Sequence, residues 1–144
     1  MKADAQTEAA VMASLEQFKQ AYEQRDMEHL LALFAPDPDV VLIGTGADEK
    51  CVGLAEIQRQ AERDWAQSVA LSLEWGWSSV SAAGSVAWVA ADGVGYVKVE
   101  GEEMHLPLRV TVVLEHRGAK WLWMQAHVSM PTPEQAEGES FPTA

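Results

Sequence analysis

The segment LRVTVVLEHRGAKWLWMQAHVS, residues 108 to 129, decides the fold of this 144-residue chain. It contains two runs of strand-like composition, joined at Arg117-Gly118-Ala119, a sequence typical of a turn. The segment therefore predicts a long antiparallel hairpin, with strands from about Leu106 to His116 and from Trp121 to Met130.

Two further strand patterns precede this hairpin. Residues 69 to 78 alternate bulky apolar side chains with small or polar ones, the pattern of a half-buried strand. Residues 85 to 99 are apolar on both faces, and Gly93 and Gly95 predict a bulge or bend inside them. A strand that is apolar on both faces predicts that both faces of the sheet are covered.

Helical patterns fill the N-terminal part of the chain. Residues 4 to 25 carry apolar side chains three and four positions apart, Asp26 can cap a short helix over 27 to 34, and Gly53 opens a third helix. Residues 40 to 43 predict a short strand, and residues 44 to 49 a turn. We expect one α+β domain, residues 1–131, with N-terminal helices on the concave face of a curved antiparallel sheet, and a tail over 132–144.

Composition excludes several classes of function. The formal net charge of −12 repels nucleic acid and anionic membranes. Cys51 is the single cysteine, the N-terminal residues lack the apolar core of a signal peptide, and no apolar run has transmembrane length. We therefore expect a cytoplasmic protein. The four histidines are scattered, so the sequence predicts no metal and no cofactor.

The hairpin carries the first candidate site residues. Trp123, His127 and Ser129 stand at strand spacing, so we expect them on one face, lining a pocket. His127 could bind a ligand or act as a base. The alternative is a buried histidine whose ring bonds to a neighbouring group.

Two charged residues interrupt apolar strand patterns. Arg109 could bind a carboxylate or carbonyl oxygen of a ligand, or it could pair with an acid on the adjacent strand. Asp92 could be a catalytic base with a pKa raised by burial, or a solvated carboxylate at a bulge.

The remaining candidates come from other parts of the chain. Trp88 and Tyr96 are expected on the wall opposite the hairpin, and Trp65 is a further candidate for ligand contact. Glu49 could close one end of the pocket. The alternative is that the tryptophans belong to the core or a dimer interface and that Glu49 is a solvated loop acid.

The pattern resembles the nuclear transport factor two-like superfamily, in its SnoaL-like branch. The resemblance rests on the leading helices, on residues 43 to 49 (IGTGADE) with Gly53, and on the terminal hairpin. Lys120-Trp121 followed by His127-Val128-Ser129 also resembles the end of the association domain of calcium/calmodulin-dependent kinases. The resemblance implies a cone-shaped fold, a homodimer packed through the sheet, and a pocket between the helices and the concave face.

Three functions are compatible with this fold, because one fold hosts many activities. The first is a domain that binds a small molecule in an enclosed, mostly apolar pocket. The second is an isomerase, cyclase or dehydratase that uses Asp92 or His127 as its base. The third is a homo-oligomeric assembly module, for which the pocket is filled by side chains.

Overall fold

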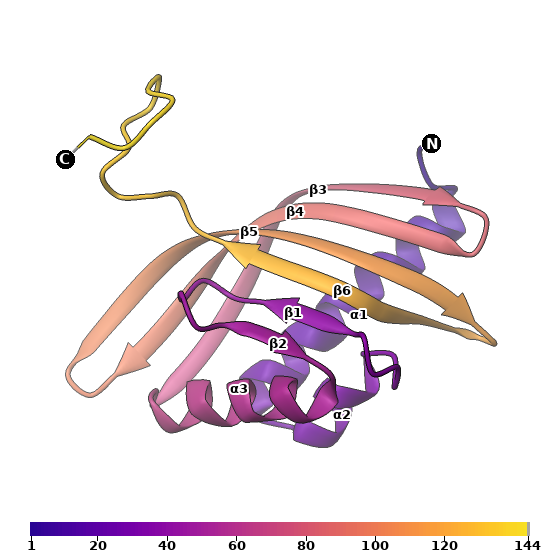
Figure 1. Ribbon diagram of the computed structural model, residues 1–144, viewed down its shortest axis with the longest axis horizontal. Helices are drawn as coiled ribbons and strands as arrows, with labels where there is room; N and C mark the ends of the chain where they lie inside the picture. Colours follow the sequence, from indigo (N-terminus) through magenta and orange to yellow (C-terminus); the bar gives the residue numbers. More distant parts are fainter. Residues whose placement is uncertain (144) are drawn as a thin grey trace.

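The structure is a computed structural model that describes residues 1 to 143 (Figure 1). Its elements, in chain order, are α1 (Ala5–Gln24), α2 (Met27–Ala32), β1 (Val41–Ile43), β2 (Lys50–Val52), α3 (Leu54–Ala66), β3 (Ala70–Ala83), β4 (Val86–Val99), β5 (Glu102–Arg117) and β6 (Lys120–Ser129). The predicted α+β order, with helices first and a run of antiparallel strands after them, is confirmed.

The strands form one six-stranded sheet in the order β2-β1-β6-β5-β4-β3. The β1–β6 pair is parallel, and the other neighbouring pairs are antiparallel. The terminal hairpin thus lies in the middle of the sheet. Strand β2 is the one element without a counterpart in the sequence patterns, because three residues are too short to show a period of two.

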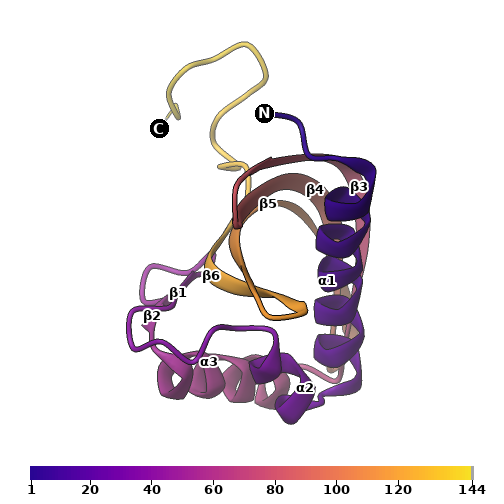
Figure 2. The same cartoon turned by 90° about the vertical axis from the view of Figure 1, so that its right-hand side faces the viewer.

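The helices cover the concave face of the sheet. In Figure 2, α1 runs along one side of the curved sheet while α2 and α3 close its lower end. Asp4 caps α1 by accepting a 2.7 Å hydrogen bond from the Thr7 N–H, and Arg25 ends the helix in the left-handed conformation. Val11 and Leu15 of α1 are buried in the main core against the sheet.

Two bulges shape the sheet. The β3–β4 register shifts between Trp75 and Ser78, and the β5–β6 register shifts where Trp123 and Gln125 flank Met124. A bulge increases local twist and bends its strand, so both shifts contribute to the curvature of the sheet. The sequence predicts a bulge at Gly93 of β4, but β4 pairs with β5 without interruption. The bulge lies instead in the neighbouring strand β3, between Trp75 and Ser78.

The chain leaves β6 as a tail without helix or strand up to residue 143. The tail extends away from the sheet on the side of the N-terminus (Figures 1 and 2). The Thr143 N–H donates to the Glu134 carbonyl, which closes the tail into a loop. Within the described residues, no helix combines the length and apolar character that crossing a membrane requires.

Candidate functional site

A cavity of about 450 Å³ lies between the inner face of the sheet and helices α1 and α3. Most of its lining is apolar, and the polar residues gather at α3 and at the β1–β2 connection. Its lining includes Phe18, Tyr22, Glu49, Gln60, Asp64, Trp75, Trp123 and Ala126. This volume and lining are typical of a small-molecule site.

Aromatic rings form one wall of the cavity. Phe18 stacks between Tyr22 and Trp123, with ring centroids 5.6 Å and 4.9 Å away. The indole N–H of Trp75 donates to the Leu15 carbonyl of α1 at 3.3 Å, and that of Trp123 donates to the Ser14 hydroxyl. Because both indole donors are bonded to α1, these tryptophans present apolar ring surface to the cavity.

The polar end of the cavity is a hydrogen-bonded cluster from three elements. The Tyr22 hydroxyl, on α1, donates to Asp64 Oδ2 on α3 at 2.5 Å. Gln60, one turn before Asp64, donates from Nε2 to Asp64 Oδ1 at 2.8 Å and to Glu49 Oε1 at 2.9 Å. Positions i and i+4 share a helix face, so α3 directs Gln60 and Asp64 toward the same space.

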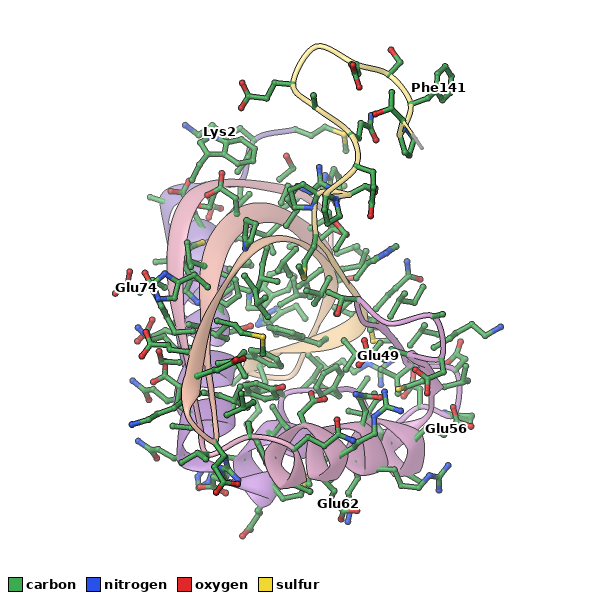
Figure 3. All side chains as sticks on the ribbon, turned by 90° about the vertical axis from the view of Figure 1, so that its left-hand side faces the viewer. Lys2, Glu49, Glu56, Glu62, Glu74 and Phe141 are labelled. Carbon is green, nitrogen blue, oxygen red and sulfur yellow. The ribbon has the colours of Figure 1, made fainter. Side chains whose placement is uncertain are left out.

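Glu49 accepts hydrogen bonds from three further donors besides Gln60. Arg63 donates to Glu49 Oε1 at 3.2 Å, and the Gly46 N–H and Thr45 hydroxyl donate to Oε2. The Arg63 guanidinium also bonds Asp48 at 2.7 and 3.3 Å. Figure 3 shows Glu49 above α3, on the inner side of the molecule. Its carboxylate therefore closes one end of the cavity with its oxygens already bonded.

Burial changes the acid–base properties of the pair at the centre of this cluster. Burial raises the pKa of Asp64, and the hydrogen bonds from Tyr22 and Gln60 oppose that rise. Burial, followed by the negative charge of Asp64, raises the pKa of Tyr22 well above its ordinary value. The phenol thus stays protonated at physiological pH and remains a hydrogen-bond donor to Asp64.

Of the residues singled out in the sequence, Glu49 and Trp123 line the cavity. Trp65 lies directly behind the lining. Its indole N–H donates to the Tyr22 carbonyl at 3.1 Å, and its ring lies 6.0 Å from the Tyr22 ring. Trp65 therefore supports the position of Tyr22.

The structure places the other six candidates on the outer face of the sheet: Trp88, Asp92, Tyr96, Arg109, His127 and Ser129. Two register pairs, Asp92 with Arg109 and Thr111 with His127, align these positions across the strands. The expectation that His127 and Ser129 share a face with Trp123 is wrong, because the extra residue Met124 reverses the side-chain direction between them.

Asp92 and Tyr96 have specific partners on this outer face. The carboxylate of Asp92 is exposed and accepts a 2.9 Å hydrogen bond from the Trp77 N–H at the β3 bulge. The Tyr96 hydroxyl donates to Glu74 at 3.1 Å, and Figure 3 shows Glu74 projecting outward from the sheet. Asp92 thus accepts a hydrogen bond from a backbone N–H of the β3 bulge. This agrees with the alternative interpretation of Asp92, a solvated carboxylate at a bulge.

Sequence reasoning missed Tyr22, Gln60 and Asp64 as site residues. Tyr22 fits the apolar stripe of α1, and the sequence pattern does not distinguish it from the core residues of that stripe. The signal on α3 was available, because Gln60 and Asp64 lie next to the buried Ile57 and Ala61 on an amphipathic helix. Polar residues at the border of a buried helix face point to a cavity or an ion pair, and the sequence alone does not separate these.

No group of three or more potential ligands for a metal ion exists within residues 1 to 143. The acidic cluster at the cavity is arranged instead around the hydrogen bonds of Gln60 and Arg63.

Comparisons with solved structures place this architecture among nuclear transport factor 2-like proteins. A candidate dehydratase of that family from Streptomyces avermitilis has 20% identity and a TM-score of 0.78, over 86% of this chain and 95% of its own. A superfamily protein from Salmonella enterica has 15% identity and a TM-score of 0.83, over 96% and 100%. A candidate calcium/calmodulin-dependent protein kinase II association domain from Xanthomonas campestris has 23% identity and a TM-score of 0.75, over 86% of each chain.

The similarity to these structures establishes the fold. The search against curated proteins returned no match. A family model described as "SnoaL-like domain" matches residues 11–133, which include both helices and strands of the cavity. The chain therefore belongs to the SnoaL-like domain family.

Proposed function

We propose that this protein binds a small, mostly apolar molecule in the cavity between α1, α3 and the sheet. The observation that carries the proposal is a space of about 450 Å³ with apolar walls and hydrogen-bonding groups gathered at one end. Such a site takes up an apolar body by burial and orients it through one polar group. A pure assembly module is less well supported, because its pocket is expected to be filled by side chains.

The proton-transfer alternative depends on the same cluster. Asp64 is a carboxylate with a raised pKa in an apolar cavity, which is the environment of a general base. An isomerase or dehydratase also needs a donor for the oxygen on which charge develops. The Tyr22 hydroxyl and both Gln60 bonds are directed at Asp64 and Glu49, so the geometry favours binding over proton transfer.

A neutral apolar dye tests the proposal. N-phenyl-1-naphthylamine is expected to bind with a rise in fluorescence and to saturate at one dye per chain. Replacing Ala126, a buried residue of the lining, with phenylalanine fills part of the cavity and is expected to weaken dye binding about tenfold. Fluorescence titration of both proteins measures this difference.

The matched control is Ala83→Phe, which adds the same ring at an exposed position at the end of β3. This variant is expected to bind the dye as the unsubstituted protein does. Equal dye affinities for the Ala126 and Ala83 variants, both folded by circular dichroism, would contradict binding in the cavity.

We also propose that two copies of the chain pair through the outer face of the sheet. Trp88 is 37% exposed on this face, and Val113 and Tyr96 lie on it half-buried. Aromatic and aliphatic side chains that a sheet face exposes to water favour a covering partner. Native mass spectrometry is expected to give twice the mass of the chain, and a stable monomer at micromolar concentration would contradict this pairing.

A further inference from the structure

The two carboxylates at the polar end of the cavity, Glu49 and Asp64, differ in the number of hydrogen bonds that they accept. Glu49 receives four donors, two on each carboxylate oxygen. Asp64 receives one donor on each oxygen, from Gln60 and from Tyr22. A carboxylate has about four acceptor positions, so Asp64 alone of these two acids keeps free acceptor capacity.

The hydrogen-bond donors that contact Asp64, from Tyr22 and Gln60, are already bonded to carboxylates. The single O–H of Tyr22 is bonded to Asp64, and the amide nitrogen of Gln60 is shared between Asp64 and Glu49. The two tryptophans of the wall donate to α1, away from the cavity. At Asp64 itself a ligand therefore meets free acceptor positions and supplies the hydrogen-bond donor, whereas Gln67 and Ser72 elsewhere in the lining can donate or accept.

The charges around the cavity also favour a ligand that carries donors, and in particular a positively charged one. Its lining includes the acids Glu49 and Asp64 and no lysine, arginine or histidine from the described residues. Arg63 is directed at Asp48 and Glu49, and Arg25, which is not a lining residue, donates to the carbonyls of Trp65 and of Ser68 at the edge of the lining. A ligand carboxylate would meet the negative charge of Asp64 in a partly buried site, whereas a cation would be attracted to it.

The aromatic wall adds a second feature that favours a cation. Tyr22 lies both in the stacked series with Phe18 and in the hydrogen bond with Asp64. The cavity thus presents aromatic ring surface beside a carboxylate with free acceptor positions. Aromatic faces attract ammonium groups through their quadrupole, by about 0.5–2 kcal/mol in proteins.

From this combination we propose that the cavity selects an apolar amine, which binds as an ammonium ion against Asp64. The inference rests on the proposed binding function and narrows its ligand class. An alcohol supplies one donor without a charge and ranks second. An acid of the same skeleton ranks last, in contrast to the sequence-based alternative in which Arg109 binds a ligand carboxylate.

The test compares three compounds that share one naphthyl skeleton: 2-(1-naphthyl)ethylamine, 2-(1-naphthyl)ethanol and 1-naphthylacetate. Each displaces N-phenyl-1-naphthylamine from the protein at pH 7.5. The amine is expected to bind about tenfold more tightly than the alcohol, since its bond to Asp64 is charge-assisted. The acid is expected to bind more weakly than both.

Two variants locate the preference. Asp64→Asn removes the carboxylate and is expected to bring amine and alcohol affinities to within about twofold of each other. Glu62→Gln removes a charge from the same helix, where Glu62 is exposed and points away from the cavity (Figure 3). This control is expected to keep the tenfold preference, which separates the Asp64 contact from general attraction to an acidic protein.

The pH dependence gives a further readout. Tyr22 and Gln60 bond to Asp64, and the charges of Glu49 and Arg63 act on it. Burial raises the pKa of Asp64, so Asp64 keeps its proton to a higher pH than an exposed acid. Amine affinity is expected to rise as pH increases through this ionisation, and alcohol affinity to change less. The Asp64→Asn variant is expected to lose the rise.

The outcomes separate the two proposals. Binding of the alcohol or the acid at least as tightly as the amine would overturn the amine inference and leave the binding function intact. Retention of the tenfold preference in a folded Asp64→Asn variant would overturn it as well. Failure of the dye and of all three compounds to bind would overturn the binding function itself.

Discussion

Replacement of Trp123 by alanine is expected to lower the free energy of unfolding by about 3–5 kcal/mol, the range for removing a fully buried tryptophan. Trp123 is 1% exposed and is the largest fully buried side chain. It stacks on Phe18, meets Phe34 edge-on at 5.4 Å, and donates to Ser14. The substitution removes these contacts together and enlarges the cavity that Trp123 lines.

Urea unfolding followed by circular dichroism measures this loss. Trp77→Ala is the matched control, because Trp77 is 62% exposed. Its substitution is expected to change stability by about 0.5 kcal/mol or less, as for most surface sites. A loss below about 1 kcal/mol for Trp123→Ala would contradict the central position of this ring in the core.

Substitution of Gly93 by alanine is expected to lower the free energy of unfolding by about 1–3 kcal/mol. A Cβ atom at this position would lie 2.6 Å from the Glu74 carbonyl oxygen and 3.2 Å from the Trp75 ring. Because the first contact is with backbone, a side-chain rotation does not relieve it. Strands β3 and β4 have to separate beside the bulge that bends the sheet.

The same urea measurement tests this prediction. Ser79→Ala, at an exposed position farther along β3, is the control and is expected to change stability by about 0.5 kcal/mol or less. A Gly93→Ala variant as stable as this control would show that the two strands accommodate a side chain here without cost.

The sheet and the helices could be predicted from the sequence because their signals are local. Alternation over residues 69 to 78 predicts β3, and the spacing of Val11, Leu15 and Phe18 predicts α1. The turn residues between 116 and 120 fix the terminal hairpin. Each of these patterns is complete within one element, so it does not depend on the rest of the fold.

The faces of the sheet could not be predicted in the same way. Alternation assigns side chains to two faces, but one additional residue at Met124 moves His127 to the face opposite Trp123. No glycine or proline stands at this position to mark the bulge. The outward placement of Arg109 and Asp92 follows from pairing across three strands, which is a tertiary property.

The polar cluster of Tyr22, Glu49, Gln60 and Asp64 also depends on tertiary packing and could not be predicted from local patterns. Tyr22 and Asp64 are 42 residues apart, and each is an ordinary member of its helix until α1 and α3 pack together. Glu49 is a candidate from the sequence because it lies in a glycine-containing turn, and its bond to Gln60 depends on where α3 lies. Spatial proximity of this kind carries no signal in a single sequence.

A crystal structure of the protein co-crystallised with N-phenyl-1-naphthylamine tests most directly the claim that this cavity is the binding site. We expect the dye in the cavity, with its rings between Trp75 and Trp123 and its amine N–H directed at Asp64. Dye on the outer face near Trp88 and His127, or side chains that fill the cavity in the crystal, would contradict the claim that this cavity is the binding site.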